Sequence, residues 1–155
     1  MKRPIIGKKT NPLATSHPLV VDPCSDQTLG PRVLGLVGFS QGTMIALAVG
    51  LKRNPAPAAI VGYSGALATG EALPTEPASA PAILLVHGDM DEVIPVDALF
   101  LAREQLAHAG LPVEWHVSEG IGHGIDGEGL RLGGAFLRQA FATAPSSQAL
   151  SGNSI

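Results

Sequence analysis

Residues 35–47 read GLVGFSQGTMIAL, and the predicted fold is built outward from these residues. It begins inside the apolar run Arg32–Phe39, and a short apolar run that ends beside a glycine is typical of a buried strand. The residues of Thr43–Arg53 favour a helix that stops before Asn54-Pro55. Between them stands Ser40, with a glycine two positions away on each side. The stretch therefore predicts a strand, a sharp turn at the serine, and a helix.

Strand and helix patterns continue to alternate after this stretch. Further strands are predicted over Ala58–Tyr63, Ala82–Gly88 and Val113–Ser118. Two segments between and after them carry apolar or small residues on one helical face. These residues are Leu99, Ala102, Leu106 and Ala109 in the first segment, and Leu130, Gly134, Leu137 and Phe141 in the second. The alternation predicts the α/β class, with a mostly parallel sheet, helices on both faces, and the half-polar last strand at an edge.

Composition bounds the kind of protein. The chain has 155 residues, of which 45% are hydrophobic, so we expect one domain with a buried core. The formal net charge of −3 indicates neither a nucleic-acid partner nor an anionic membrane surface. Residues 1–31 hold five prolines without periodicity and predict an irregular leader, residues 32–144 the α/β domain, and residues 145–155 a disordered tail. We find no signal peptide or membrane-spanning stretch and expect a cytoplasmic protein.

Ser40 is a candidate nucleophile because of the turn on which it stands. A serine hydroxyl reacts poorly at neutral pH unless a base takes its proton and donors hold the oxyanion that forms. A sharp strand-to-helix turn lifts the serine above the strand and points backbone N–H groups at the same space. The pattern G-x-S-x-G at residues 38–42 is weak by itself in a glycine-rich chain, but the flanking strand and helix strengthen it. Ser64 also follows a strand, but its second glycine is misplaced. We interpret Ser64 as a turn residue, with a position at the mouth of the pocket as the alternative.

An acid and a base follow in the order that such hydrolases use, serine, then acid, then histidine. The segment HGDMDEVIP supplies the acid, Asp89 or Asp91, after one predicted strand, and EGIGHGID supplies His123 after the next. Open parallel sheets place their sites at the carboxyl ends of the strands. We therefore expect the serine, the acid and the histidine to converge at one edge of the sheet.

From about residue 32 to residue 141 the chain resembles the C-terminal half of an α/β-hydrolase. More narrowly, it is similar to the bacterial carboxylesterase/phospholipase group, which is related to the acyl-protein thioesterases. The matching pieces are LVGFSQGTMIAL, GYSGAL, ILLVHGDMDEVIPVDAL and VEWHVSEGIGHGIDGEGL. The resemblance implies that Ser40 is the nucleophile, Asp91 the acid and His123 the base. It also implies that the backbone N–H of Gln41 is one oxyanion donor.

Other polar residues in these pieces have structural interpretations. Asp89 competes with Asp91 as the acid, although the first aspartate of such a pair can instead hold the turn by accepting backbone N–H groups. His87, at the end of its strand, is expected to bond to backbone. No histidine has metal-ligand spacing with Cys or Glu, so we predict no metal. We predict no organic cofactor either, because ester hydrolysis needs only water as second substrate.

The resemblance also shows a missing part. Members of the family usually have several strands before the sharp turn that carries the serine, which is called the elbow. In that earlier part of the chain, a loop with the pattern H-G-x-G gives the second oxyanion N–H. We find no such loop, and residues 1–31 do not resemble the missing segment. The strand before Ser40 is then expected to lack its usual neighbour, and an unpaired apolar edge invites self-association. Two interpretations stay open, a truncated or frame-shifted gene product, or a chain that borrows the missing strands from another copy.

Two hypotheses from different classes follow. The first is a serine hydrolase that cleaves small-molecule carboxylic esters or thioesters, of the carboxylesterase, lysophospholipase or thioesterase type. The second is a truncated, non-catalytic remnant that keeps the three site residues but lacks the oxyanion loop. Neither hypothesis includes a nucleic acid or a membrane as partner.

Overall fold

A computed structural model describes residues 19–21, 34–68 and 80–144 of the chain. It holds one five-stranded sheet in the order β1-β2-β3-β4-β5. The strands are β1 (Leu19–Val21), β2 (Gly35–Phe39), β3 (Ala59–Tyr63), β4 (Ala82–Gly88) and β5 (Val113–Ser118). Strands β2 to β5 are parallel, and β1 is antiparallel to β2. The helices are α1 (Gln41–Gly50), α2 (Asp97–His108) and α3 (Gly127–Thr143).

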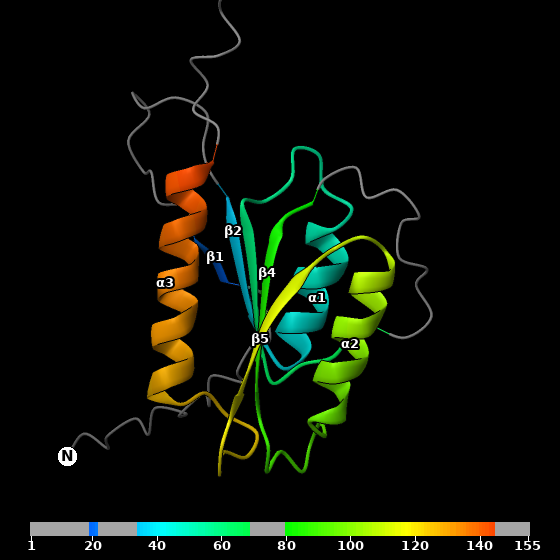
Figure 1. The fold of residues 1–155 in the computed structure, drawn as a ribbon, viewed down its shortest axis with the longest axis vertical. Coiled ribbons are helices and arrows are strands. Elements are labelled where there is room, and N and C mark those ends of the chain that lie inside the picture. Colours follow the sequence, from blue (N-terminus) through cyan, green and yellow to red (C-terminus); the bar gives the residue numbers. More distant parts are fainter. Residues whose placement is uncertain (1–18, 22–33, 69–79, 145–155) are drawn as a thin grey trace, which may run out of the picture.

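The helices lie in two layers on either side of the sheet, as Figure 1 shows. One core joins α1 and α2 to the sheet, and a second core joins α3 to the opposite face. All five residues of β3 are buried, which fits a central strand covered on both faces. The first core is built around Leu36, Ala46, Leu47, Ile60, Ile83, Leu85, Leu99, Ala102 and Leu106, and the second around Val61, Tyr63, Leu84 and Val86. The predicted fold class, with helices on both faces and β5 at an edge, is confirmed.

Element boundaries follow the sequence pattern closely on the C-terminal side. The predicted strands at 82–88 and 113–118 have the predicted bounds. Helix α1 begins at Gln41, two residues before its predicted start, because it follows the serine at once. It ends at Gly50, since the N–H groups of Lys52 and Arg53 donate to carbonyls three residues back and tighten the last turn. None of the described helices is long and apolar enough to span a bilayer.

Strand β1 departs from the expected organisation. It lies within the predicted irregular leader and pairs Leu19 with Val37 and Val21 with Gly35. Residues 19–21, which the sequence assigned to an irregular leader, therefore form a strand. The strand before Ser40 was expected to lack its usual neighbour, and over Gly35–Val37 it has this short antiparallel one. Three residues are too few to show a periodicity, so only the pairing with β2 defines this strand. The rest of the predicted leader and the predicted tail lie outside the described residues.

Candidate active site

Ser40 occupies the sharp turn between β2 and α1. Its backbone has φ 54° and ψ −122°, in a region that non-glycine residues rarely adopt. Gly38 makes the turn possible, because a Cβ atom there would collide with the carbonyl oxygen of Gly42 and lie 2.5 Å from the backbone nitrogen of Thr43. The N–H of Ser40 donates to the carbonyl oxygen of Tyr63 at 2.8 Å, which ties the turn to the end of β3. The predicted sharp bend at the serine is therefore present.

Thr43 holds the same turn from inside α1. Its side chain is buried, and its hydroxyl oxygen lies 2.9 Å from the carbonyl oxygens of both Gly38 and Tyr63. The hydroxyl also accepts the N–H of Tyr63 at 3.0 Å. The first turn of α1 is thus bonded to the ends of both β2 and β3. From the sequence Thr43 was placed only at the start of a helix, because no pattern distinguishes a buried hydroxyl that bonds to two strands.

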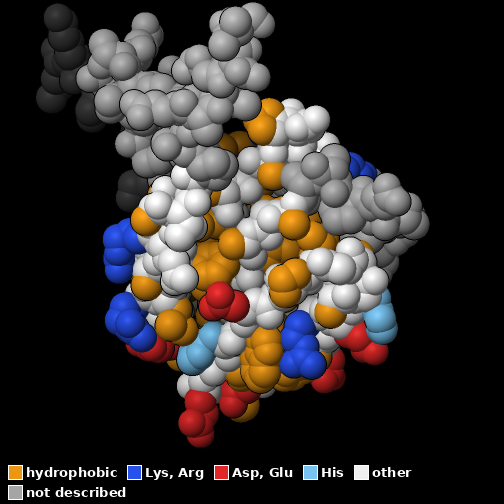
Figure 2. Space-filling view, turned by 45° about the horizontal axis from the view of Figure 1, so that its top comes forward, with side chains coloured by type: hydrophobic (Ala, Val, Ile, Leu, Met, Phe, Trp, Pro, Cys, Tyr) orange, Lys and Arg blue, Asp and Glu red, His pale blue; other side chains and the backbone are white. Residues whose placement is uncertain are grey.

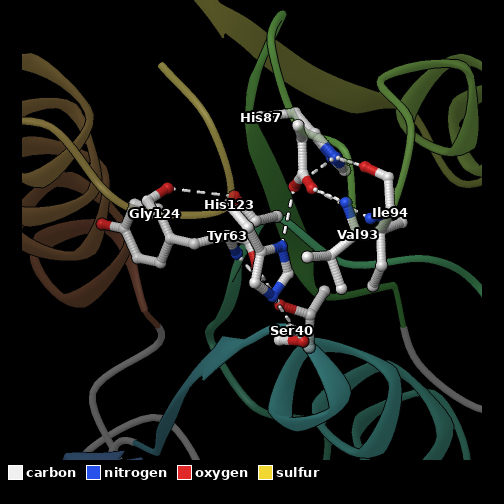
Figure 3. Close-up of polar contacts among 10 residues, drawn as sticks. Ser40, Tyr63, His87, Val93, Ile94, His123 and Gly124 are labelled. Carbon is white, nitrogen blue, oxygen red and sulfur yellow. Dashed lines mark hydrogen bonds and ion pairs between the residues drawn. The ribbon is translucent and has the colours of Figure 1, made fainter.

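Ser40, His123 and Asp91 form one hydrogen-bonded chain. The Oγ of Ser40 lies 2.9 Å from Nε2 of His123, and Nδ1 of His123 lies 2.8 Å from Oδ2 of Asp91 (Figure 3). A carboxylate can only accept, so Nδ1 carries the proton and Nε2 is left to accept from the serine. The three residues follow β2, β5 and β4, whose carboxyl ends meet at the lower edge of the sheet in Figure 1. The structure thus brings together three residues that the sequence places 51 and 32 positions apart.

Asp91 is buried and both of its oxygens are bonded. Oδ1 accepts the backbone N–H groups of Val93 and Ile94, each at 2.9 Å, while Oδ2 faces His123. Burial alone would raise the pKa of this carboxyl, but the N–H of Ile94, the imidazole of His123 and the N–H of Val93 together lower it below its usual value. Asp91 is therefore ionised at neutral pH and holds the imidazole in one tautomer.

Asp89, the competing acid, lies elsewhere. It is exposed, and its Oδ1 accepts the N–H of Gly120 at 2.6 Å, in the loop that leads to His123. Its own N–H donates to the carbonyl oxygen of Ser118 at 3.1 Å. Asp89 thus bonds to backbone, as expected of the first aspartate, but its partner is 31 residues away and not in its own turn. Only Asp91 of the two aspartates reaches the histidine.

His87 is a second imidazole beside the same carboxylate. It is almost completely buried, and its Nε2 lies 2.8 Å from the carbonyl oxygen of Ile94 and 3.3 Å from Oδ2 of Asp91. A carbonyl only accepts, so Nε2 carries a proton in this arrangement. The predicted bond to backbone is confirmed. The approach to Asp91 was missed, and the four-residue spacing in HGDMD was the only sequence signal for it.

The surroundings of the serine are apolar on one side and open to solvent. The ring of Phe39 lies 5.0 Å from that of His123, and Phe39, Met90 and Val93 are all exposed. Gln41 is the first residue of α1, and N–H groups in a first helical turn point out of its positive end. Within residues 34–68 and 80–144, no group of three His, Cys, Asp or Glu side chains is placed to hold a metal ion. The arrangement brings a hydroxyl, an imidazole, a carboxylate and the first turn of a helix together.

Known proteins are similar to this chain in sequence. A profile of the phospholipase/carboxylesterase family matches residues 17–140. The chain belongs to this family. Esterase YpfH of Escherichia coli K12 is 32% identical over 125 residues, which are 80% of this chain and 52% of that protein. Acyl-protein thioesterase 1 of Gibberella zeae is 30% identical over 119 residues, 74% of this chain and 51% of that protein.

A solved esterase structure is also similar to this chain, and it too is matched over about half of its length. The crystal structure of esterase PE8 matches with a TM-score of 0.63 and 44% identity, over 68% of this chain and 49% of that chain. The α/β-hydrolase fold expected from the sequence is thereby confirmed, as is the family of ester and thioester hydrolases. The phospholipase/carboxylesterase chain described here spans about half the length of the curated relatives it matches.

Proposed function

We propose that this chain is a serine hydrolase that cleaves small-molecule carboxylic esters or thioesters. The observation that carries the proposal is the hydrogen-bonded chain from the Ser40 hydroxyl through His123 to Asp91. A hydroxyl becomes a useful nucleophile when a base accepts its proton, and the base becomes effective when a third group orients it. The strained turn at Ser40 and the lowered pKa of Asp91 support the same roles.

The reaction has two stages in this proposal. Ser40 Oγ attacks the acyl carbon while His123 Nε2 takes its proton, and Asp91 stabilises the imidazolium. The oxyanion forms at the start of α1, where the N–H of Gln41 is the proposed donor. The carbon–oxygen or carbon–sulfur bond then breaks, and His123 returns the proton to the leaving alcohol or thiol. Water, deprotonated by His123, attacks the acyl-serine and releases the carboxylic acid and free Ser40.

Oxygen esters and thioesters present the same tetrahedral intermediate to these groups, so both belong to the proposal. Support comes from the relatives, one of which is an esterase and another an acyl-protein thioesterase. The exposed apolar side chains of Phe39, Met90 and Val93 beside the histidine and the acid loop favour a substrate with an apolar part next to its carbonyl.

A fluorophosphonate probe tests the proposal directly, because it phosphonylates only an activated serine. We expect one label per chain, located on the peptide that contains Ser40, and no label in Ser40→Ala. The purified parent is also expected to hydrolyse a short p-nitrophenyl ester faster than the variant does. Equal labelling of parent and variant, or no labelling of the parent, would favour the non-catalytic remnant instead.

A further inference from the structure

We propose that Ser64 is a positioning residue that holds His123 in reach of Ser40, an inference that rests on the proposed function of these two residues. Ser64 follows β3, the strand between the one that leads to the serine and the one that leads to the acid. From the sequence, Ser64 was interpreted as a turn residue, with the mouth of the pocket as the alternative. Its burial, its hydroxyl bond and its backbone conformation together indicate more than that.

The hydroxyl of Ser64 bonds to the loop that carries the histidine. It donates to the carbonyl oxygen of Gly124 at 3.0 Å, and the dashed line at Gly124 in Figure 3 marks this bond. Ser64 has no exposed surface, and its own N–H donates to the carbonyl oxygen of Val86 at 2.8 Å. Gly124 is the residue directly after His123. The bond therefore fixes the backbone at the base itself.

The loop that carries His123 has open space beside two of its glycines. Cβ atoms added at Gly120 or Gly124 would meet nothing within 4 Å, so the loop packs loosely around these two glycines. Before the histidine, the loop is held at Ile121, whose carbonyl oxygen accepts the N–H of Met90 at 2.9 Å. After it, the Ser64 hydroxyl holds Gly124. Asp89 Oδ1 also accepts the N–H of Gly120 on the side before the histidine, at 2.6 Å. The segment before His123 is thus bonded to the loop after β4, and the Ser64 hydroxyl bonds to the segment directly after it.

The backbone of Ser64 points to a requirement for the hydroxyl. Its φ is 43°, and within the described residues the only other non-glycine residue with positive φ is Ser40. Glycine adopts this conformation without strain, so a serine here is favoured only if its side chain contributes something. The next residue, Gly65, lies so close to the turn at Ser40 that an added Cβ would be 2.9 Å from the carbonyl oxygen of Ser40. The turn after β3 therefore contacts both the nucleophile and the loop of the base.

Ser64→Gly separates positioning from folding. The variant loses the hydroxyl but relieves the positive φ, so its melting temperature is expected to stay within a few degrees of the parent's. Freed of its bond, the Gly124 segment moves and His123 loses its alignment. A misplacement of about 1 Å costs on the order of a hundredfold in rate. We expect kcat to fall about ten- to hundredfold while KM changes less than about twofold.

Two matched variants accompany it. Ser64→Ala also removes the hydroxyl but keeps the strained backbone, so it should show the same loss of kcat. Thr143→Ala removes an exposed hydroxyl that bonds to the carbonyl oxygens of Gln139 and Ala140 at the end of α3, and should leave kcat unchanged. A loss of activity in Ser64→Gly that only matches its unfolded fraction would overturn the proposal.

A second measurement tests whether Ser64 positions His123 without relying on catalytic turnover. A ring N–H held by a carboxylate gives a separate, far-downfield proton signal in NMR spectra, and His123 Nδ1 lies 2.8 Å from Asp91. We expect this signal in the parent and its broadening or loss in Ser64→Gly. An unchanged signal together with a parental rate of probe labelling would overturn the role of Ser64. If the parent does not label at Ser40, the proposed function fails, and the NMR comparison still decides whether Ser64 positions the imidazole.

Discussion

At the scale of single residues, the loop after β4 fixes the orientation of the Asp91 carboxylate. Two backbone N–H groups occupy Oδ1, so Oδ2 is directed to His123 and cannot turn away. An asparagine has almost the same shape, but its NH₂ group donates where Asp91 accepts. The substitution therefore changes the tautomer of the imidazole and leaves the loop in place.

We predict that Asp91→Asn lowers kcat by about 10³- to 10⁴-fold, because His123 then presents a proton to Ser40 where it should accept one. The rate of ester hydrolysis by purified variants measures this effect. Asp89→Asn is the matched control, since Asp89 bonds to the backbone of Gly120 and should cost less than about tenfold. If both substitutions lower kcat equally, the assignment of the acid to Asp91 is wrong.

At the scale of elements, α3 begins at a cap that also touches β5. The carboxylate of Asp126 accepts the N–H of Gly129 at 2.8 Å and the hydroxyl of Ser118 at 2.9 Å. The N–H of Gly129 is the largest cause that lowers the pKa of Asp126; partial burial opposes it and the Ser118 hydroxyl assists it. A lowered folded-state pKa means that this stabilisation is present above the unfolded value, near pH 4, and is lost as pH falls through the folded value.

We predict that Asp126→Ala lowers the free energy of unfolding by about 1 kcal/mol at pH 7. The difference between parent and variant should shrink as the pH is lowered from 7 toward 2, because the parent's carboxylate is then protonated. Urea denaturation of both proteins across this range measures the difference. A difference that stays constant with pH would show that the charge on the cap contributes nothing.

The elements also show how far the sequence predicts this fold. Strands β4 and β5 and helix α2 were located closely, because apolar runs and helical periodicity are local properties. Strand β1 was missed, because its three residues are defined by pairing with β2. In the site, the order of the motifs along the chain predicted Ser40 and His123 as site residues. The burial and the hydrogen bond of Ser64 were not predicted, because they depend on a contact with a residue 60 positions away.

At the scale of the whole molecule, the described sheet ends at β1 and β5. Figure 2 shows hydrophobic side chains in the middle of one face, with charged side chains around them. Large hydrophobic side chains that are more than half exposed include Val49, Met90, Val93, Leu101 and Leu130. Exposed apolar surface and an open strand edge both favour association. Since β1 covers part of β2, the predicted self-association now concerns the outer edge of β1.

We predict that the weight-average mass in sedimentation velocity rises with protein concentration and that Val20→Lys weakens this rise. A lysine on an edge strand opposes pairing between chains by charge repulsion. The variant's circular dichroism spectrum should match the parent's, which serves as the control for folding. A parent that stays monomeric at every concentration contradicts association through this edge.

The activation of Ser40 by His123 is tested by the rate at which a fluorophosphonate labels Ser40 in the parent and in His123→Ala, with mass spectrometry locating the label. If His123 activates Ser40, the parent is labelled at this serine and the variant reacts on the order of 10³-fold more slowly at neutral pH. The variant's labelling rate should rise only at high pH, where hydroxide replaces the missing base. Equal labelling rates in the two proteins at neutral pH would contradict the claim that the Ser40–His123–Asp91 chain is a catalytic site.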